Sequence, residues 1–188
     1  VLLVLPLREG GALISTYCHG LERLSADGAH ISRVPGIADD ECIFAAAQSA
    51  DGTVWLDRGG RFTRWDEAGP TTLFTLAAEA TIKVIEVEGA RAWLGTTAGL
   101  VELDLSTRPA TVVRTWTTAD GLLDDKVLAL SRGPDGALFI GTQRGAMRLR
   151  GARLERLVPP AKDRPAAVRD LLVELGGVVW LATYGEGL

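Results

Sequence analysis

The sequence predicts an all-β fold, and three observations carry that prediction. Short apolar stretches of strand length alternate with turn signals such as Asp51-Gly52 and Pro134-Asp135-Gly136. One large apolar residue recurs in the second stretch of each group at intervals of roughly 40 residues; these anchors are Leu13, Trp55, Trp93, Phe139 and Trp180. A repeat of about 40–45 residues with four strands is typical of one β-propeller blade, so we expect four-stranded antiparallel blades.

The clearest repeat covers residues 120–157. A turn leads into an apolar run at 127–130, the turn at 134–136 follows, and a second run closes on Gly141-Thr142. A third, alternating run ends at Leu149, and 152–157 supplies a fourth segment. This stretch therefore predicts a four-stranded meander.

The other repeats follow the same order. The expected strands are 1–7, 12–16, 20–25 and 29–34 in the first, 42–48, 53–57, 61–65 and 71–76 in the second, and 82–88, 90–96, 99–105 and 111–116 in the third. In the fifth, the leucine spacing of 166–175 also suits a helix, but its match to 126–133 favours a strand, followed by another at 178–183. We expect a single array over 1–188, with repeats at 1–35, 36–78, 79–119, 120–160 and a truncated 161–188. The result would be an open or incomplete propeller of about four and a half blades.

The charge balance argues against nucleic acid as a partner. The 188 residues include 20 Lys and Arg against 24 Asp and Glu, a net charge of -4, with no basic block. The apolar segment 1–7 is far too short to span a bilayer, so we expect no membrane insertion by this part of the protein. The chain does not begin with Met, and we expect it to be a piece of a longer protein.

Two positions of the repeat have architectural roles. The anchor fills the wedge between neighbouring blades, where one aromatic ring buries on the order of 150–250 Å². The glycine two residues later, Gly95 or Gly141, allows a neighbouring backbone to approach closely or a bulge to form.

The order of motifs resembles the two-component regulator propeller repeat. A Gly-Leu turn, a polar pair, an apolar strand, Asp-Gly, an aromatic residue and Ile-Gly-Thr occur in 120–149, and shorter versions read ARAWLGTTAGLVEL, GVVWLATYGEGL and DGTVWLDRGGRFTRW. The first two repeats depart from the pattern, since Ser15 and Asp57 stand where later repeats have Gly95 and Gly141. This departure affects the local geometry expected of the first two blades more than the prediction that they are blades.

The resemblance implies a role. Such repeats form the periplasmic sensory part of bacterial membrane-bound regulators, ahead of a histidine kinase or diguanylate cyclase output domain. On this basis the chain is an extracytoplasmic, ligand-binding segment of an inner-membrane signalling protein, not itself an enzyme, in a dimeric parent. Its partners would be a small-molecule or oligosaccharide ligand, the remaining blades and the downstream domains.

Two acidic pairs are the main candidates for ligand recognition. Asp39-Asp40 and Asp124-Asp125 both precede a first strand, in connections that match nearly position for position, so we expect them to occupy one structural place. They can bind a cationic or hydroxylated ligand or Ca²⁺, or they can be solvated turn residues that cap strands. Both interpretations stay open.

Three further ligand candidates lie in or near turns that follow second strands. A sugar-binding propeller needs arginines and aromatic rings near one mouth, which Arg58, Arg144 and Tyr184 would supply. The alternative is ordinary exposure or packing between blades, since ligand pockets are few in any protein.

No metal site, cofactor or catalytic residue is predicted. Cys18 and His19 are adjacent, so their side chains point in different directions and form a poor chelate. Cys18 and Cys42 fall in neighbouring repeats, where a disulfide is one option, but we expect two buried free thiols.

Two other function classes remain open. One is a scaffold that binds proteins without signalling. The other is a propeller lyase or glycosidase, which needs clustered His, Glu or Tyr side chains at the channel mouth, whereas the chain has only His19 and His30 and no nucleophile motif.

Overall fold

The computed structural model describes residues 3–16, 18–66, 68–77, 79–157 and 166–184. In these residues the chain forms 18 β-strands and one short 3-10 helix, η1 (Thr118–Asp120). The strands make five antiparallel sheets, four of four strands and one of two, each built from strands that are consecutive in the chain. The predicted all-β architecture is therefore confirmed.

The sheets are meanders whose strands lie in chain order. The first contains β1 (Leu3–Pro6), β2 (Ala12–Ser15), β3 (Leu21–Leu24) and β4 (Ile31–Arg33), and the second β5 (Ala46–Gln48), β6 (Val54–Asp57), β7 (Arg61–Asp66) and β8 (Gly69–Thr75). The third contains β9 (Ile82–Glu88), β10 (Arg91–Thr96), β11 (Gly99–Asp104) and β12 (Thr111–Trp116). The fourth contains β13 (Val127–Arg132), β14 (Leu138–Thr142), β15 (Gly145–Arg150) and β16 (Arg153–Arg156), and the fifth β17 (Val168–Val173) and β18 (Val179–Thr183).

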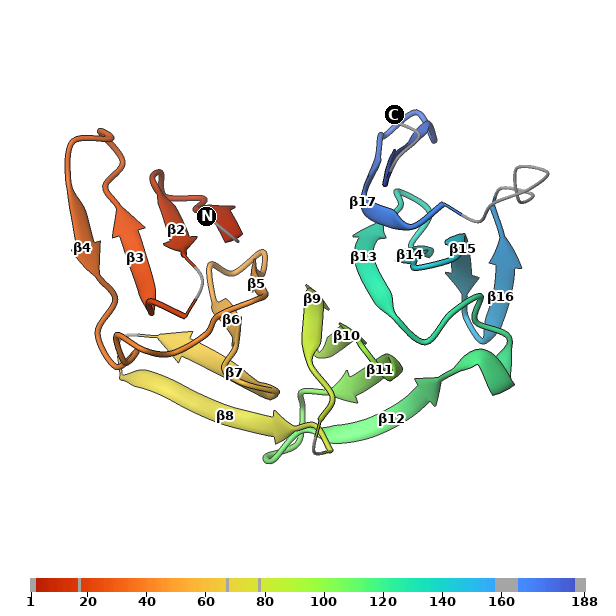
Figure 1. Cartoon of the computed structure of the whole chain (residues 1–188), viewed down its shortest axis with the longest axis horizontal. Helices are drawn as coiled ribbons and strands as arrows, with labels where there is room; N and C mark the ends of the chain where they lie inside the picture. The colour runs from red at the N-terminus through yellow and green to blue at the C-terminus, as the bar shows by residue number, and fades with distance from the viewer. Residues whose placement is uncertain (1–2, 17, 67, 78, 158–165, 185–188) are drawn as a thin grey trace.

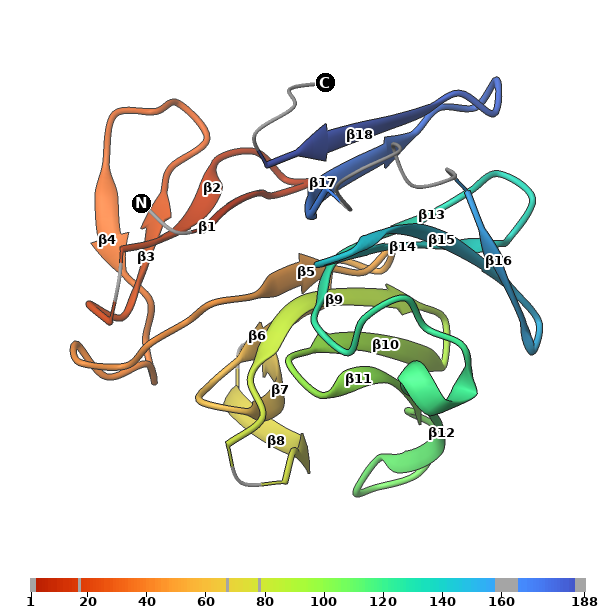
Figure 2. The ribbon, with the colours of Figure 1, turned by 45° about the vertical axis from the view of Figure 1, so that its right-hand side comes forward.

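The five sheets are blades of an open β-propeller (Figure 1). They follow one another around an arc, with β1, β5, β9, β13 and β17 toward the centre and β4, β8, β12 and β16 at the rim. Figure 2 shows β17 lying against β13 and β14, so that the fifth sheet stacks on the fourth. The arc is not closed: Figure 1 shows a gap between its two ends, and among the described residues no strand of the first blade packs extensively against β17 or β18.

Four apolar clusters form the core, and each lies between two consecutive blades. Every cluster contains both the anchor of one blade and the β-branched residue that opens the next blade: Leu13 and Ile43, Trp55 and Ile82, Trp93 and Val127, and Phe139 and Val168. These opening residues are at most 2% exposed. A blade therefore buries its apolar faces only against its neighbours, as expected of a repeat architecture.

Three segments test the strand predictions most directly. Segment 166–175 contains a strand, β17, and not a helix, as predicted. The first strand of the second blade is shorter than the predicted 42–48, because the Ile43 carbonyl accepts a hydrogen bond from the Ser15 hydroxyl of the first blade instead of joining the ladder. The helix η1 was not predicted; the Asp120 carboxylate accepts the Thr117 N–H at 3.0 Å and holds this turn.

Candidate functional site

The candidate site is the loop face, which we define as the connections between blades together with the turns between second and third strands. In an antiparallel meander the first strand starts where the second strand ends, so both kinds of loop converge on one side of the propeller. Connection 34–45 precedes β5 and connection 117–126 precedes β13, and Arg58, Arg144 and Tyr184 follow β6, β14 and β18. All seven ligand candidates from the sequence thus lie on the loop face.

Arg58 is engaged by a carboxylate of the same blade. Its guanidinium donates two hydrogen bonds of 2.7 Å to Glu41 and one of 3.3 Å to the Gly36 carbonyl. The two charged side chains are only 16% and 12% exposed. Burial of the Glu41 carboxyl opposes ionisation, but the hydrogen bonds and charge of Arg58 outweigh it and hold the pKa of Glu41 below its usual value. Arg58 therefore holds connection 34–45 against the turn that follows β6.

Asp39 and Asp40 project from the same connection into solvent. The Asp39 side chain is 81% exposed and lies 3.5 Å from the guanidinium of Arg33, which also donates a 2.5 Å hydrogen bond to the His19 carbonyl. Asp40 is also exposed. An ion pair this open to water contributes little to stability, so a ligand can displace Arg33 from Asp39 at small cost.

The second acidic pair is bonded to nearby backbone. Asp125 accepts the Thr118 N–H at 2.6 Å, and Asp124 accepts the Lys126 N–H at 2.8 Å in an Asx turn. The Asp125 carbonyl accepts the Gly99 N–H, just as the Glu41 carbonyl accepts the Gly20 N–H in the first connection. By these bonds Asp125 corresponds to Glu41 and not to Asp40. The expectation that both acidic pairs occupy one structural place is therefore wrong by one residue.

Arg144 and Tyr184 are exposed, and their described contacts stay within their own blades. The Arg144 N–H donates to the Thr142 hydroxyl at 3.2 Å. The Tyr184 side chain is 75% exposed, and the Arg169 guanidinium lies 5.5 Å from its ring centroid. These residues share the loop face with the acidic pairs but lie on different blades.

A buried carboxylate lies beneath the loop face. Asp57 occupies the repeat position of Gly95 and Gly141, and it is 0% exposed. One of its oxygens accepts the Gly60 N–H at 2.8 Å, while Oδ2 has no hydrogen-bond partner within the described part of the chain. Burial, opposed by the Gly60 hydrogen bond and the positive charge of Lys83, raises the pKa of Asp57 to about 6. The sequence marked this position as a departure from the repeat but gave no sign of its pKa.

A second carboxyl group with a raised pKa lies toward the opposite face. Glu86 on β9 is the cross-strand partner of Trp93, whose ring is covered by the Arg132 guanidinium at 3.9 Å. Arg132 pairs with Glu88 at 3.0 Å. Burial raises the pKa of Glu86 to about 6, against the attraction of Arg132 and with a smaller contribution from Glu88. Sequence reasoning missed this group, because its burial depends on the fourth blade.

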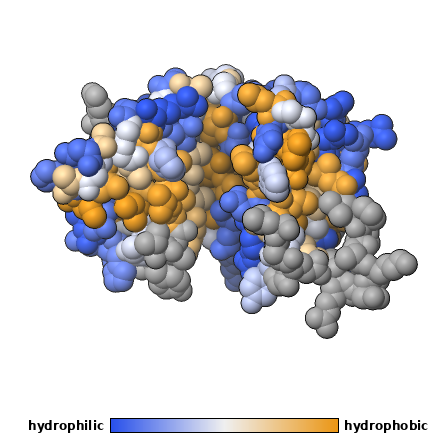
Figure 3. Space-filling model, turned by 90° about the horizontal axis from the view of Figure 1, so that it is seen from above, coloured by the Kyte–Doolittle hydropathy of each residue, from blue (hydrophilic) through white to orange (hydrophobic). Residues whose placement is uncertain are grey.

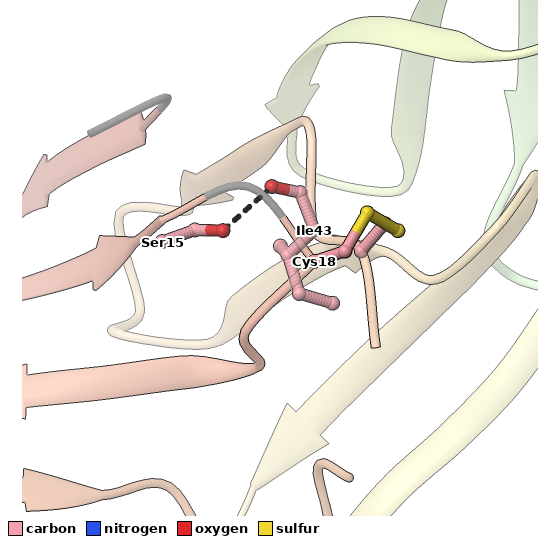
Figure 4. The surroundings of a disulfide bond; sticks show 4 residues. Ser15, Cys18 and Ile43 are labelled. Atoms are coloured by element: carbon pink, nitrogen blue, oxygen red, sulfur yellow. Dashed lines mark hydrogen bonds between the residues drawn. A yellow bond between two sulfur atoms is a disulfide. The ribbon is translucent and has the colours of Figure 1, made fainter. Parts of the chain in front are cut away.

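Cys18 and Cys42 form a disulfide, so the expectation of two free thiols is wrong. The bond joins the turn after β2 to the connection before β5, next to the hydrogen bond from Ser15 to Ile43 (Figure 4). The pairing follows from the seam between the first two blades, which brings these loops together. The spacing of Cys18 and Cys42 in the sequence does not require the two residues to be in contact, so the sequence alone did not predict the disulfide.

The described residues lack two other kinds of feature, a metal-binding cluster and a membrane-spanning helix. No three His, Cys, Asp or Glu side chains in these ranges are grouped so as to hold a metal ion. The described residues also include no helix of the length and apolarity needed to cross a membrane.

The arrangement defines a β-propeller segment, and comparison with solved structures gives the same class. Compared by sequence, the chain matches no protein-family model and no curated protein. The extracellular domain of BT3049 from B. thetaiotaomicron, assigned to a hybrid two-component system, is similar over 97% of this chain with a TM-score of 0.78 and 18% identity. The extracellular domain of BT4673 from the same organism, assigned to a one-component system, is similar over 97% of this chain with a TM-score of 0.75 and 20% identity.

These matches establish the fold of the chain. The chain spans 25% of the length of each of the two extracellular domains. Virginiamycin B lyase from Staphylococcus aureus is also similar, with a TM-score of 0.73 and 13% identity over 97% of this chain and 62% of the lyase. Since a propeller of a different function is also similar, at a lower TM-score and identity, function must be argued from the residues of this chain.

Proposed function

We propose that the chain is a sensor segment of an extracytoplasmic propeller in a bacterial signal-transduction protein. The observation that supports this most is the match of 97% of the chain to extracellular domains assigned to one- and two-component systems. In this proposal the segment is not catalytic. Ligand binding at the loop face shifts the orientation of the next domain and biases a dimeric output domain, a histidine kinase or a diguanylate cyclase, outside this chain.

The disulfide supports the proposed location. Disulfides persist in oxidising compartments such as the bacterial periplasm and are rare in the cytosol. The Cys18–Cys42 bond therefore fits a periplasmic segment of an inner-membrane protein. Mass spectrometry of the protein isolated from its native host, with thiols alkylated before reduction, should find both cysteines protected. Two alkylated cysteines would contradict the proposed location.

The charges of the loop face indicate the ligand class. Asp39 and Asp40 are exposed carboxylates at the surface, with only a solvent-exposed ion pair to displace. Such groups attract cations and accept hydrogen bonds from hydroxyl groups. We therefore propose a polyamine or an oligosaccharide as the ligand.

A thermal-shift screen of the chain tests this assignment. Spermidine and a set of neutral oligosaccharides are the probes, and a ligand that binds the folded state raises Tm. The double variant Asp39→Asn, Asp40→Asn should abolish the shift. The matched control is Glu9→Gln, which changes one acid in the turn between β1 and β2 on the opposite face and should keep the shift. No stabilisation by any probe, or the same shift in the double variant, would contradict binding at this site.

The signalling role has its own test. The full reading frame should encode a membrane span and a kinase or cyclase domain. A reading frame with neither would reject the signalling role and leave the scaffold as the better proposal, whatever the ligand screen finds.

A further inference from the structure

The fifth blade carries an apolar surface whose counterparts in the other blades are covered. We call the face of a blade that meets the next blade in the chain its forward face. The anchors on the first four forward faces are at most 7% exposed. On the fifth, Trp180 is 50% exposed and its cross-strand partner Leu172 is 60% exposed. In Figure 3 apolar residues (orange) cover parts of both lobes, including the right-hand lobe, the side on which β13 to β17 lie in Figure 1.

The exposed surface is hollowed. A pocket of about 220 Å³ is lined by Asp170, Leu171, Leu172, Trp180 and Ala182. Asp170 is paired with Ala182 and Leu172 with Trp180 across the two strands, so four of the five residues lie on the forward face. The pocket is therefore a property of the blade seam and not of the loop face.

The covered seams show what fills such a surface. At two seams the glycine two positions after the anchor lies close to the opening residue of the next blade: a Cβ at Gly95 would meet Val127 Cγ1 at 2.7 Å, and one at Gly141 would meet Val168 Cγ1 at 2.9 Å. The corresponding residue on the fifth blade is Ala182, which is one methyl group larger than glycine and smaller than Ser15 and Asp57, the residues at this position of the first two seams. Every opening residue is β-branched, a type that packs well on a pleated surface.

The chemistry of the pocket favours a protein strand over a sugar. Asp170 is its one charged lining residue, and the Trp180 Nε1–H already donates to Glu174 at 2.7 Å. A bound sugar needs several hydrogen-bond partners around the aromatic ring, whereas an apolar strand needs none beyond its own ladder.

We propose that the forward face of the fifth blade binds the first strand of a further propeller blade, an apolar segment that opens on a β-branched residue. This inference continues an interface that the chain forms four times, and it is independent of the proposed sensing role.

An extended chain tests the proposal. Residues 147–188 are appended after Leu188, so that the fifth blade gains the third and fourth strands of the fourth blade and a copy of the last half-blade follows. In the appended copy the tryptophan is changed to Phe, so only the original Trp180 reports on the surface. Its accessibility is the difference in acrylamide quenching between each protein and its Trp180→Phe variant. We expect the quenching constant of Trp180 to fall several-fold in the extended chain.

Two variants distinguish specific packing at this seam from nonspecific association of apolar surfaces. Leu172→Asp in the original blade should restore quenching of Trp180, because it places a charge in the seam. The matched control Val112→Asp changes an exposed apolar residue on β12, 48% exposed, and should leave the protection intact. If the extended chain does not fold, a peptide of residues 82–96 added to the unextended chain should protect Trp180, and the same peptide with Ile82→Asp should not.

Three results would overturn the proposal. One is unchanged Trp180 quenching in a folded extended chain or with the peptide. Another is protection of Trp180 in the unextended chain that rises with its own concentration together with a dimer in sedimentation, which would assign the surface to a second copy. The third is protection by maltohexaose, which would make the pocket a sugar site.

Discussion

Adding one methyl group at Gly95 should destabilise the propeller, because this glycine lies where the third and fourth blades touch. A Cβ there would stand 2.5 Å from Val84 Cγ1 and 2.7 Å from Val127 Cγ1. Both valines are β-branched, so rotation about χ1 gives little relief. Overpacking of this kind costs about 1–3 kcal/mol. We therefore expect Gly95→Ala to lower the free energy of unfolding by about that amount.

A double-mutant cycle shows whether the cost arises at the seam. Val127→Ala removes two fully buried methyl groups, worth about 1–2 kcal/mol, and also removes one of the two close contacts. The variant with both changes should be less destabilised than the sum of the single changes, by about 0.5 kcal/mol or more. The overpacking is only partly relieved in the double variant, because the close contact with Val84 remains. The measurement is urea denaturation followed by far-UV circular dichroism.

The matched control is Gly176→Ala. A Cβ at Gly176 meets nothing within 4 Å, and the backbone there is not in the left-handed region, so the change should stay within about 0.5 kcal/mol of the starting protein. A neutral Gly95→Ala, or strict additivity with Val127→Ala, would refute the close-packed seam.

Three further changes test groups around the first blades. Asp57 has a folded-state pKa of about 6 against an ordinary value of 3.8, so the folded protein holds the extra proton and its stability falls as the pH rises from about 4 to 6. Asp57→Asn should remove this loss, which is at most about 3 kcal/mol at pH 7.5 and nothing at pH 4. Equal effects of the substitution at both pH values would contradict the raised pKa. Reduction of the Cys18–Cys42 disulfide removes a cross-link between residues 24 apart and should lower the free energy of unfolding by about 3 kcal/mol. Urea denaturation with and without dithiothreitol measures this change, and an unchanged midpoint would count against the pairing. Arg58→Ala removes both 2.7 Å hydrogen bonds to the mostly buried Glu41, which keeps only 3.4 Å contacts with Arg61 and the Ala38 N–H, and should cost about 1–3 kcal/mol. Arg33→Ala, which removes solvent-exposed ion pairs with Asp39 and Glu22, should cost under about 0.5 kcal/mol; equal thermal shifts would be the opposing result.

The architecture was predictable because each blade repeats the same steric problem. An aromatic residue such as Phe139 and a glycine such as Gly141 fill and narrow one seam, and their recurrence is visible without coordinates. The state of Cys18 and Cys42 was not predictable, because it depends on how two loops from different blades meet. The same holds for Glu86, which reads as an exposed strand residue until the fourth blade covers it.

The ligand candidates show a finer limit of sequence comparison. Aligning the two connections from their glycines pairs Asp40 with Asp125, whereas the backbone hydrogen bonds pair Glu41 with Asp125. The first connection has one more residue between its glycine and the β-branched residue that opens the next blade. A repeat fixes where strands lie, but an extra residue in a loop is absorbed locally, so side-chain roles in loops do not transfer between blades by position.

The distribution of bonded charges narrows the part of the loop face where a ligand can act. Glu41 is held by Arg58, and Asp125 by the Thr118 N–H, so a ligand at either carboxylate must break a bond that the fold uses. A ligand at Asp39 and Asp40 has to break only the ion pair between Asp39 and Arg33, which is exposed to water and contributes little. Recognition through exposed charges is screened by salt, with a Debye length of about 10 Å at 0.1 M. Binding of a polyamine at this pair should therefore weaken steeply between 20 and 500 mM salt, on the order of tenfold or more, as measured by titration calorimetry. Affinity that does not change with salt would shift the site to uncharged parts of the loop face.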